Sequence, residues 1–283
     1  MSLSAPLFPL ISTQDLAALM GDPSLRVIDG SWHMDGRDGR AEFAAARIPG
    51  ACFFDLDAVS DQSSDLPHML PSPEAFSAAM ADLGVSETDR IIVYDAAGLF
   101  SAARVWWTLK VMGAAQVQVL DGGLPRWRAE GRPVETGAVS NPPARAVFAA
   151  ALNAQAVASL DDVRAALEDG TQVADARGAA RFSGKAADPR PGVQPGHMPG
   201  AFNLPYSSLI AADGRLKSGQ ALQDAFVSAG IDIGQQVVTT CGSGVTAAII
   251  TLALAALDRP SRLYDGSWAE WGRRSDTPIV REA

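Results

Sequence analysis

The sequence predicts two tandem α/β domains, each with a mainly parallel sheet flanked by helices. An internal repeat supports this prediction, because segments of the first half recur in the second. Each half also alternates short β-branched runs with helical segments, as α/β domains do. Finally, 283 residues with 47% hydrophobic content exceed what one ordinary core needs and suffice for two.

The repeat is defined by several matching anchors. "RVID", which ends at Asp29, matches "QVAD", which ends at Asp175, and "IIVYD", which ends at Asp95, matches "VVTTC", which ends at Cys241. "SPEAFSAAMADLG" at 72–84 matches "SGQALQDAFVSAG" at 218–230. The two members of each of these three pairs lie 146 positions apart. "LDGGLPRWRAEGRP" and "YDGSWAEWGRRSDTP" follow at an offset of 144. Chance does not align so many anchors, so the chain is a duplication.

One pair of repeated segments reads as a helix with defined ends. Ser72 can accept hydrogen bonds from the free N–H groups of a first turn, and Pro73 suits the first helical position. Gly84 can take the left-handed conformation that ends a helix. Ser218 and Gly230 repeat these signals in the second half.

A linker is expected between the halves. The segment "ETGAVSNPPARAVFAAALNAQAV" is small, polar and marked by prolines, which is typical of a linker. The predicted organisation is an N-terminal domain at 1–138, a linker at 139–152 and a C-terminal domain at 153–283.

The overall composition argues against several classes of partner. The net charge is -9 and no basic block occurs, which disfavours nucleic acid and steering of anions by the global field. An anionic substrate would therefore need local arginines. No window reaches the roughly 18 apolar residues of a membrane span, and the start has no signal-peptide pattern, so we expect a cytoplasmic protein without a membrane partner. Cys52 and Cys241 are the only cysteines, which suits a reducing compartment.

The stretch "VVTTCGSGVTA" places Cys241 between a predicted buried strand and a predicted apolar helix. A tight loop at this point aims backbone N–H groups inward, and the helix adds the positive end of its dipole. An anion would be stabilised there, so we expect Cys241 to be a thiolate at neutral pH. The alternative is an inert buried cysteine.

Two other motifs share this stretch. "GSGVTA" fits a dinucleotide fingerprint, with Asp265 near the distance of a ribose-binding acid. This signal is weak, because too few residues follow and the matching loop "DAAGLFSAA" lacks the pattern. A cysteine phosphatase would need an arginine at position 247, where this chain has alanine. Phosphoryl transfer is therefore disfavoured.

The chain resembles the two-domain rhodanese superfamily. The resemblance covers nearly the whole chain, through "DGSWH", "ARIPGACFFDLD", "HMLPSPEAF", "GLFSAARVWW", "LDGGLPRW", "GHMPGAFNLP", "CGSGVT" and "YDGSWAEW". It implies two rhodanese-like domains, of which the second is catalytic, since Asp95 stands where the second half has Cys241. Thiosulfate-using relatives carry basic residues after the cysteine, whereas Gly242 and Ser243 suit the branch that uses 3-mercaptopyruvate.

The resemblance also implies roles for individual residues. Cys241 matches the nucleophile that forms a persulfide, and Arg181 and Arg190 match two arginines that hold the carboxylate and carbonyl of mercaptopyruvate. A guanidinium fork pairs well with a planar carboxylate. Asp57, His68 and Ser243 match a relay that moves a proton beside the sulfur. The remaining loop residues expected to contact substrate are Gly242, Gly244, Val245 and Thr246.

The expected function is therefore transfer of sulfur from 3-mercaptopyruvate, through a cysteine persulfide, to a thiol acceptor such as thioredoxin or to cyanide, with release of pyruvate. No metal or organic cofactor is expected. Two alternatives stay open: a thiosulfate sulfurtransferase, and a non-catalytic sulfur carrier or anion-binding module, which would not need two arginines and a relay. His33, His197 and Cys52 are expected to be structural.

Overall fold

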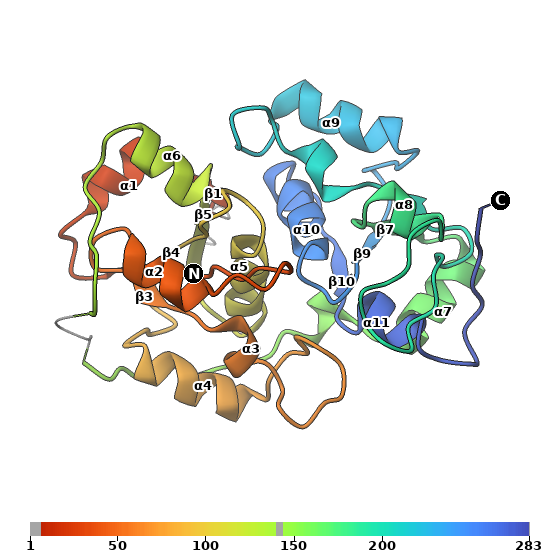
Figure 1. Cartoon of the computed structure of the whole chain (residues 1–283), viewed down its shortest axis with the longest axis horizontal. Helices are drawn as coiled ribbons and strands as arrows, with labels where there is room; N and C mark the ends of the chain where they lie inside the picture. The colour runs from red at the N-terminus through yellow and green to blue at the C-terminus, as the bar shows by residue number, and fades with distance from the viewer. Residues whose placement is uncertain (1–6, 140–143, 283) are drawn as a thin grey trace, which may run out of the picture. The chain divides into compact units, whose positions relative to one another are not determined.

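The computed structural model describes residues 7–139 and 144–282, which form two compact units (Figure 1). The first unit contains Met1–Val59 and Ser72–Leu152, and the second contains Ser60–Pro71 and Asn153–Ala283. The short segment Ser60–Pro71 therefore packs with the second unit, although it lies between two parts of the first in sequence. Residues 140–143 of the predicted linker lie outside the described residues.

The first unit contains a five-stranded sheet of order β1-β5-β4-β2-β3, in which every pairing is parallel. Helices connect the strands, as parallel pairing requires. The elements are β1 (Leu10–Ile11), α1 (Thr13–Leu19), β2 (Leu25–Asp29), α2 (Gly39–Ala45), β3 (Cys52–Phe53), α3 (Leu56–Val59), α4 (Pro73–Asp82), β4 (Arg90–Tyr94), α5 (Ala102–Val111), β5 (Gln116–Leu120) and α6 (Gly123–Ala129).

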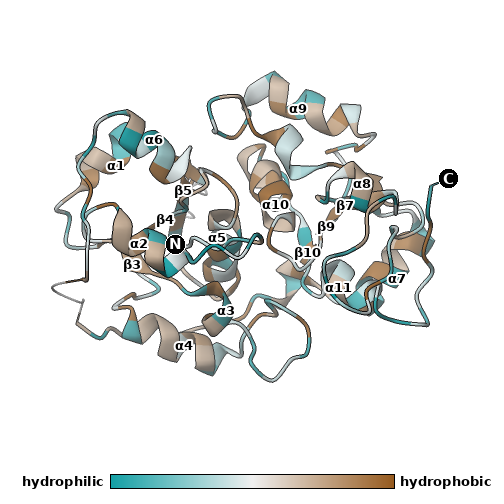
Figure 2. Cartoon of the chain, in the orientation of Figure 1, coloured by the Kyte–Doolittle hydropathy of each residue, from teal (hydrophilic) through white to brown (hydrophobic). Residues whose placement is uncertain are grey.

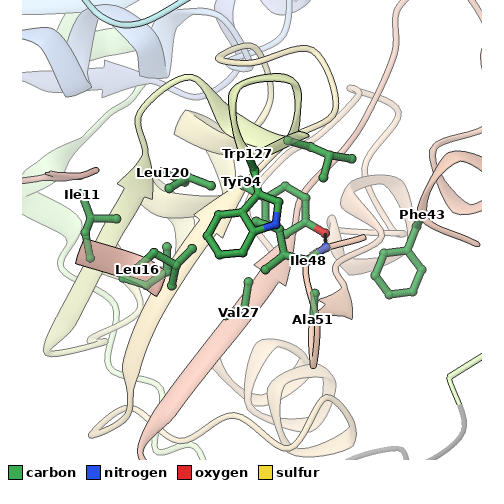
Figure 3. Packing of buried hydrophobic residues seen from close by; sticks show 11 residues of the cluster. Ile11, Leu16, Val27, Phe43, Ile48, Ala51, Tyr94, Leu120 and Trp127 are labelled. Carbon is green, nitrogen blue, oxygen red and sulfur yellow. Dashed lines mark hydrogen bonds between the residues drawn. The ribbon is translucent and has the colours of Figure 1, made fainter. Parts of the chain in front are cut away.

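Buried side chains from several of these elements pack around Tyr94 and Trp127 (Figure 3). The Tyr94 hydroxyl accepts a hydrogen bond from the backbone N–H of Ile48 at 3.2 Å, so its polar end is satisfied inside the core. The central strand β4 is buried from Ile91 to Tyr94, which explains its continuous apolar run.

The second unit repeats this architecture. Its sheet has the order β6-β10-β9-β7-β8, again with parallel pairings throughout. The predicted duplication and fold class are confirmed. The elements are the 3-10 turn η1 (Ala154–Ala156), β6 (Val157–Ala158), α7 (Leu160–Asp169), β7 (Gln172–Asp175), α8 (Ala179–Phe182), β8 (Phe202–Asn203), the 3-10 turn η2 (Tyr206–Leu209), α9 (Gly219–Ser228), β9 (Val237–Thr240), α10 (Ala247–Ala256), β10 (Arg262–Tyr264) and α11 (Ser267–Trp271).

The predicted helix ends hold in α4 and only partly in α9. The Ser72 hydroxyl accepts from the Ala75 N–H at 3.2 Å, Pro73 begins the helix, and Gly84 has a φ of 67°. The prediction for Ser218 is wrong, because its side chain makes no capping hydrogen bond. The first residue of α9 is Gly219, at the position that Pro73 has in α4. Its φ of 53° changes the backbone geometry at the start of the helix.

Helix α10 has almost no polar face, as predicted from its sequence, and the side of it seen in Figure 2 is coloured mostly as hydrophobic. Every residue from Ala247 to Leu254 is buried, so the helix lies inside the second unit. The strand before it, β9, is also buried throughout. The loop between β9 and α10 is thus held between two rigid, buried elements at the carboxyl edge of the parallel sheet, where α/β proteins place their ligand sites.

Candidate active site

Cys241 directly follows β9 and is the first residue of the loop that leads into α10. Its side chain is buried. The Cys241 carbonyl accepts from the N–H of Trp268 at 3.0 Å, and the Gly242 carbonyl accepts from Ala269 at 2.8 Å. The start of α11 therefore holds the first two residues of the loop in place through two backbone hydrogen bonds.

The N–H groups of residues 242–246 have no hydrogen-bond acceptor within the part of the chain that the structure describes. Gly244 has a φ of 79°, which a residue with a side chain adopts reluctantly. These N–H groups lie at the N-terminus of a ten-residue helix, so they form a concentration of positive potential beside Cys241. An anion placed in this loop would be stabilised by these N–H groups, and its role as a binding site stays a prediction.

The matching loop of the first unit shows what such N–H groups bind. Asp95 occupies the position of Cys241, and its carboxylate accepts from the N–H groups of Ala97 at 2.9 Å, Phe100 at 2.7 Å and Ala102 at 2.8 Å. A carboxylate of the protein thus occupies the loop in the first unit. In the second unit the same place is taken by the thiol-bearing side chain of Cys241.

Ser267 holds the backbone of Cys241 and was missed by the sequence analysis. The backbone N–H of Cys241 donates to the Ser267 hydroxyl at 3.3 Å, and that hydroxyl donates to the Tyr264 carbonyl at 2.8 Å. Ser267 is fully buried with a φ of 49°, a strained conformation for a serine. Gly123 takes this position in the first unit with a φ of 54°. The sequence signal that could have identified Ser267 is that the repeat has a glycine, Gly123, at the matching position of the first half.

Arg181 and Arg190 both reach the loop. A Cβ atom on Gly242 would lie 3.0 Å from Nη1 of Arg190 and 3.1 Å from Nη2 of Arg181, so the absence of a side chain at position 242 makes room for both guanidinium groups. The Nε of Arg181 is buried and has no acceptor among the described residues. Two cationic forks next to the nucleophile are suited to an acidic donor.

Asp188 holds the two arginines together and was also missed. Its carboxylate is buried and accepts from Arg181 Nη2 at 2.5 Å and from Arg190 Nη1 at 3.3 Å. Burial acts to raise the pKa of Asp188, but the hydrogen bond and charge of Arg181, with the backbone N–H and charge of Arg190, hold this pKa below its ordinary value. Asp188 is therefore ionised at neutral pH. The one sequence signal that could have identified Asp188 is its position two residues before Arg190.

Ser243 is in contact with two of the predicted site residues. Its hydroxyl lies 2.9 Å from Nδ1 of His68, and it accepts from Nη2 of Arg190 at 2.8 Å. All three side chains belong to the second unit. The structure thus brings together Cys241, Ser243, His68, Arg181 and Arg190 on and around one loop.

The His68 segment is anchored to the second unit by its backbone. The N–H of Leu70 donates to the Asp265 carboxylate at 2.7 Å, and Arg273 donates to the carbonyl of Asp65 at 3.3 Å. His68 itself has a φ of 61°, which marks a strained position at a candidate site. Asp57 lies in α3 of the first unit, where the indole N–H of Trp32 donates to its carboxylate at 3.1 Å. Its place in the relay stays a prediction.

The side chains expected to be structural have local partners. His33 lies 2.8 Å from Glu42, and His197 bonds the Phe182 carbonyl at 3.0 Å and stacks on its ring. Burial raises the pKa of Cys52 to about 12, which keeps this thiol protonated.

Asp265, the acid required by the dinucleotide interpretation, is buried and accepts the Leu70 N–H, which is a structural role. Within residues 7–139 and 144–282, no cluster of three or more His, Cys, Asp or Glu side chains is placed to hold a metal ion. Across the same residues, none of the helices is both long and apolar enough to cross a membrane.

Comparison with known proteins agrees with this architecture. The rhodanese-like domain model matches residues 12–130 and 159–274. The chain is 45% identical to the 3-mercaptopyruvate sulfurtransferase of Escherichia coli K12 over 93% of this chain and 95% of that protein. It is 39% identical to the mitochondrial thiosulfate/3-mercaptopyruvate sulfurtransferase 1 of Arabidopsis thaliana over 96% of this chain and 78% of that one.

Among solved structures, SseA from Escherichia coli, a 3-mercaptopyruvate sulfotransferase of rhodanese fold, superposes with a TM-score of 0.83 at 42% identity, covering 92% of this chain and 98% of that one. The chain belongs to the rhodanese family and contains two rhodanese-like domains.

Proposed function

We propose that this protein transfers the sulfur of 3-mercaptopyruvate through a persulfide on Cys241 and releases pyruvate. The family and the 3-mercaptopyruvate sulfurtransferases at up to 45% identity support this activity. The observation that carries it to named residues is the loop of unpartnered N–H groups around Cys241, faced by two arginines.

Arg181 and Arg190 are proposed to bind the α-keto carboxylate of the donor. Each presents a planar guanidinium that can donate two hydrogen bonds to a carboxylate or to a carboxylate and its neighbouring carbonyl. The unpartnered Nε of Arg181 supports this role, because a buried donor without an acceptor is unfavourable until a ligand satisfies it. Binding at this point would bring the donor's thiol toward Cys241.

In the proposed reaction, the Cys241 thiolate attacks the donor sulfur and forms the new S–S bond. The C–S bond of mercaptopyruvate breaks, and its electron pair stays on the carbon as the enolate of pyruvate. Ser243 delivers a proton to that carbon and is reprotonated through His68. The proton of the donor's thiol stays on the outer sulfur until that sulfur ionises, and the loop N–H groups at 242–246 then stabilise the persulfide anion.

An acceptor thiolate then attacks the outer sulfur of the persulfide and restores Cys241. We propose thioredoxin or a small dithiol as the acceptor, with cyanide as a substitute in assays. A cytoplasmic location is proposed as well, because the two cysteines are both free and the cycle needs a reduced thiol.

A donor assay with mass readout tests the proposal. The protein is incubated with 3-mercaptopyruvate, and intact mass and peptide mapping locate any added sulfur while released pyruvate is quantified. One added sulfur on Cys241 with an equal amount of pyruvate is expected. Persulfide formed from thiosulfate but not from mercaptopyruvate would favour the thiosulfate alternative. Anion binding with no added sulfur from either donor would indicate a non-catalytic module.

A further inference from the structure

Three charged side chains lie together beside Cys241 at the candidate donor site. Arg181 and Arg190 contribute two positive charges, and Asp188 contributes one negative charge. Among the described residues, Asp188 is the one carboxylate paired with either arginine. The formal charge of this trio is therefore one positive, which equals and opposes the charge of a single carboxylate.

Asp188 also fixes where that charge lies. One of its oxygens binds Arg181 and the other binds Arg190, so the two guanidinium groups are held on either side of one buried carboxylate. The Arg190 backbone N–H donates to the same carboxylate at 3.0 Å, which restrains the chain as well as the side chain. The guanidinium atoms that Asp188 holds, Nη2 of Arg181 and Nη1 of Arg190, are also the ones that lie closest to Gly242, beside Cys241.

We propose that Asp188 determines donor selectivity by cancelling one of the two guanidinium charges, so that the site favours a donor with one negative charge over a dianion such as thiosulfate. This inference rests on the proposed function. A dianion loses more hydration on binding than a monoanion does, and a site with one net charge compensates less of that loss. Thiosulfate would therefore bind with an uncompensated charge in a partly buried place.

Asp188→Asn tests the proposal because it keeps the shape of the side chain and raises the charge of the trio by one. The selectivity ratio is kcat/KM with 3-mercaptopyruvate divided by kcat/KM with thiosulfate, both with cyanide as acceptor. We expect this ratio to fall by about tenfold or more, because the added positive charge of the trio should lower KM for the dianion thiosulfate more than KM for the monoanion mercaptopyruvate. Asp188→Glu retains the charge and should keep the parent ratio, even if both rates decline.

Asp276→Asn is the matched control. Asp276 also bridges two arginines, Arg164 and Arg274, and its loss changes the net charge of the protein by the same amount. Neither arginine belongs to the candidate site, so the selectivity ratio should stay at the parent value. A shift as large as that of Asp188→Asn would show that overall charge matters and would overturn the proposal.

A binding measurement separates this inference from the proposed function. Pyruvate and sulfate serve as unreactive probes with one and two charges, and each is tested for protection of Cys241 against alkylation. Sulfate protection should improve relative to pyruvate in Asp188→Asn. Equal weakening of both probes would mean that Asp188 only supports the fold of the site. If the parent protein forms no persulfide, the proposed function fails, yet this comparison still decides the role of Asp188.

Discussion

The Nδ1 of His68 lies 2.9 Å from the Oγ of Ser243, although 175 positions separate the two residues. This contact places an imidazole against a hydroxyl two residues from Cys241. It exists because the segment Ser60–Pro71 packs with the second unit rather than with the elements that flank it in sequence.

If His68 and Ser243 act as one relay, the loss of either should cost about as much as the loss of both. We expect His68→Asn and Ser243→Ala each to lower kcat by about tenfold to a hundredfold, and the double variant to be little worse. Asparagine is chosen because it tolerates the positive φ of His68. A double-mutant cycle on kcat provides the measurement, and additive losses would argue against a relay.

Cys241→Ser should lose sulfur transfer by about a thousandfold or more while remaining folded, since a serine hydroxyl is too basic to ionise in the same loop. The matched control is Cys52→Ser, which removes the other thiol. Cys52 is held protonated by burial, so this variant should retain turnover. Both are assayed with 3-mercaptopyruvate, and circular dichroism reports folding. Near-normal activity in Cys241→Ser would overturn the assignment of the nucleophile.

Arg181→Lys and Arg190→Lys should each raise KM for mercaptopyruvate by about tenfold, because lysine retains the charge but loses the fork of donors. The effect on thiosulfate should be smaller, since that donor has no carboxylate. Steady-state kinetics with both donors measure this difference. Arg215→Lys, at an exposed position, serves as the control and should match the parent. Equal losses for both donors would show that the arginines do not bind the keto acid.

Gly242 should be the loop position that tolerates substitution least. Gly242→Ala introduces a Cβ near 3 Å from both guanidinium groups, so it should lower kcat/KM for mercaptopyruvate by about threefold to tenfold. The double change Gly242→Arg with Ser243→Lys adds cations near the sulfur and should move the ratio of specificity constants toward thiosulfate. It also displaces the two arginines and removes the relay hydroxyl. An unchanged ratio would mean that loop charge does not discriminate between donors.

Asp29 provides a test of stability against pH. Burial is the main cause that raises its pKa to about 6, so the folded protein holds this proton more tightly than the unfolded chain does. Ionisation therefore costs stability, and the cost is absent below a pH of about 4 and complete above a pH of about 6.

Asp29→Asn removes this cost. Relative to the parent, its free energy of unfolding should rise by about 2–3 kcal/mol between a pH of about 4 and a pH of about 7. Urea unfolding at several pH values measures the difference. A pH-independent difference for Asp29→Asn would show that its carboxyl does not titrate in this range.

The sequence by itself determined the duplication, the parallel α/β class and the identity of the loop around Cys241. These features are local: a buried strand, a glycine-rich turn and an apolar helix are each encoded in a few consecutive residues, and the repeat shows them twice. Arg181, Arg190 and His68 were identified through family resemblance, because single charged residues have no local pattern that separates a ligand from a surface group.

Only the tertiary structure showed Asp188 and Ser267 at the site and joined His68 to Ser243. Asp188 acts through two guanidinium groups, and Ser267 acts on a backbone N–H that lies 26 positions earlier in the chain. Such contacts depend on where parallel strands end and on which segment packs beside them, and neither is encoded by the residues next to the nucleophile. The sequence pointed to the Cys241 thiol as the group expected to react, whereas the folded chain determined the charges and the hydrogen bonds around it.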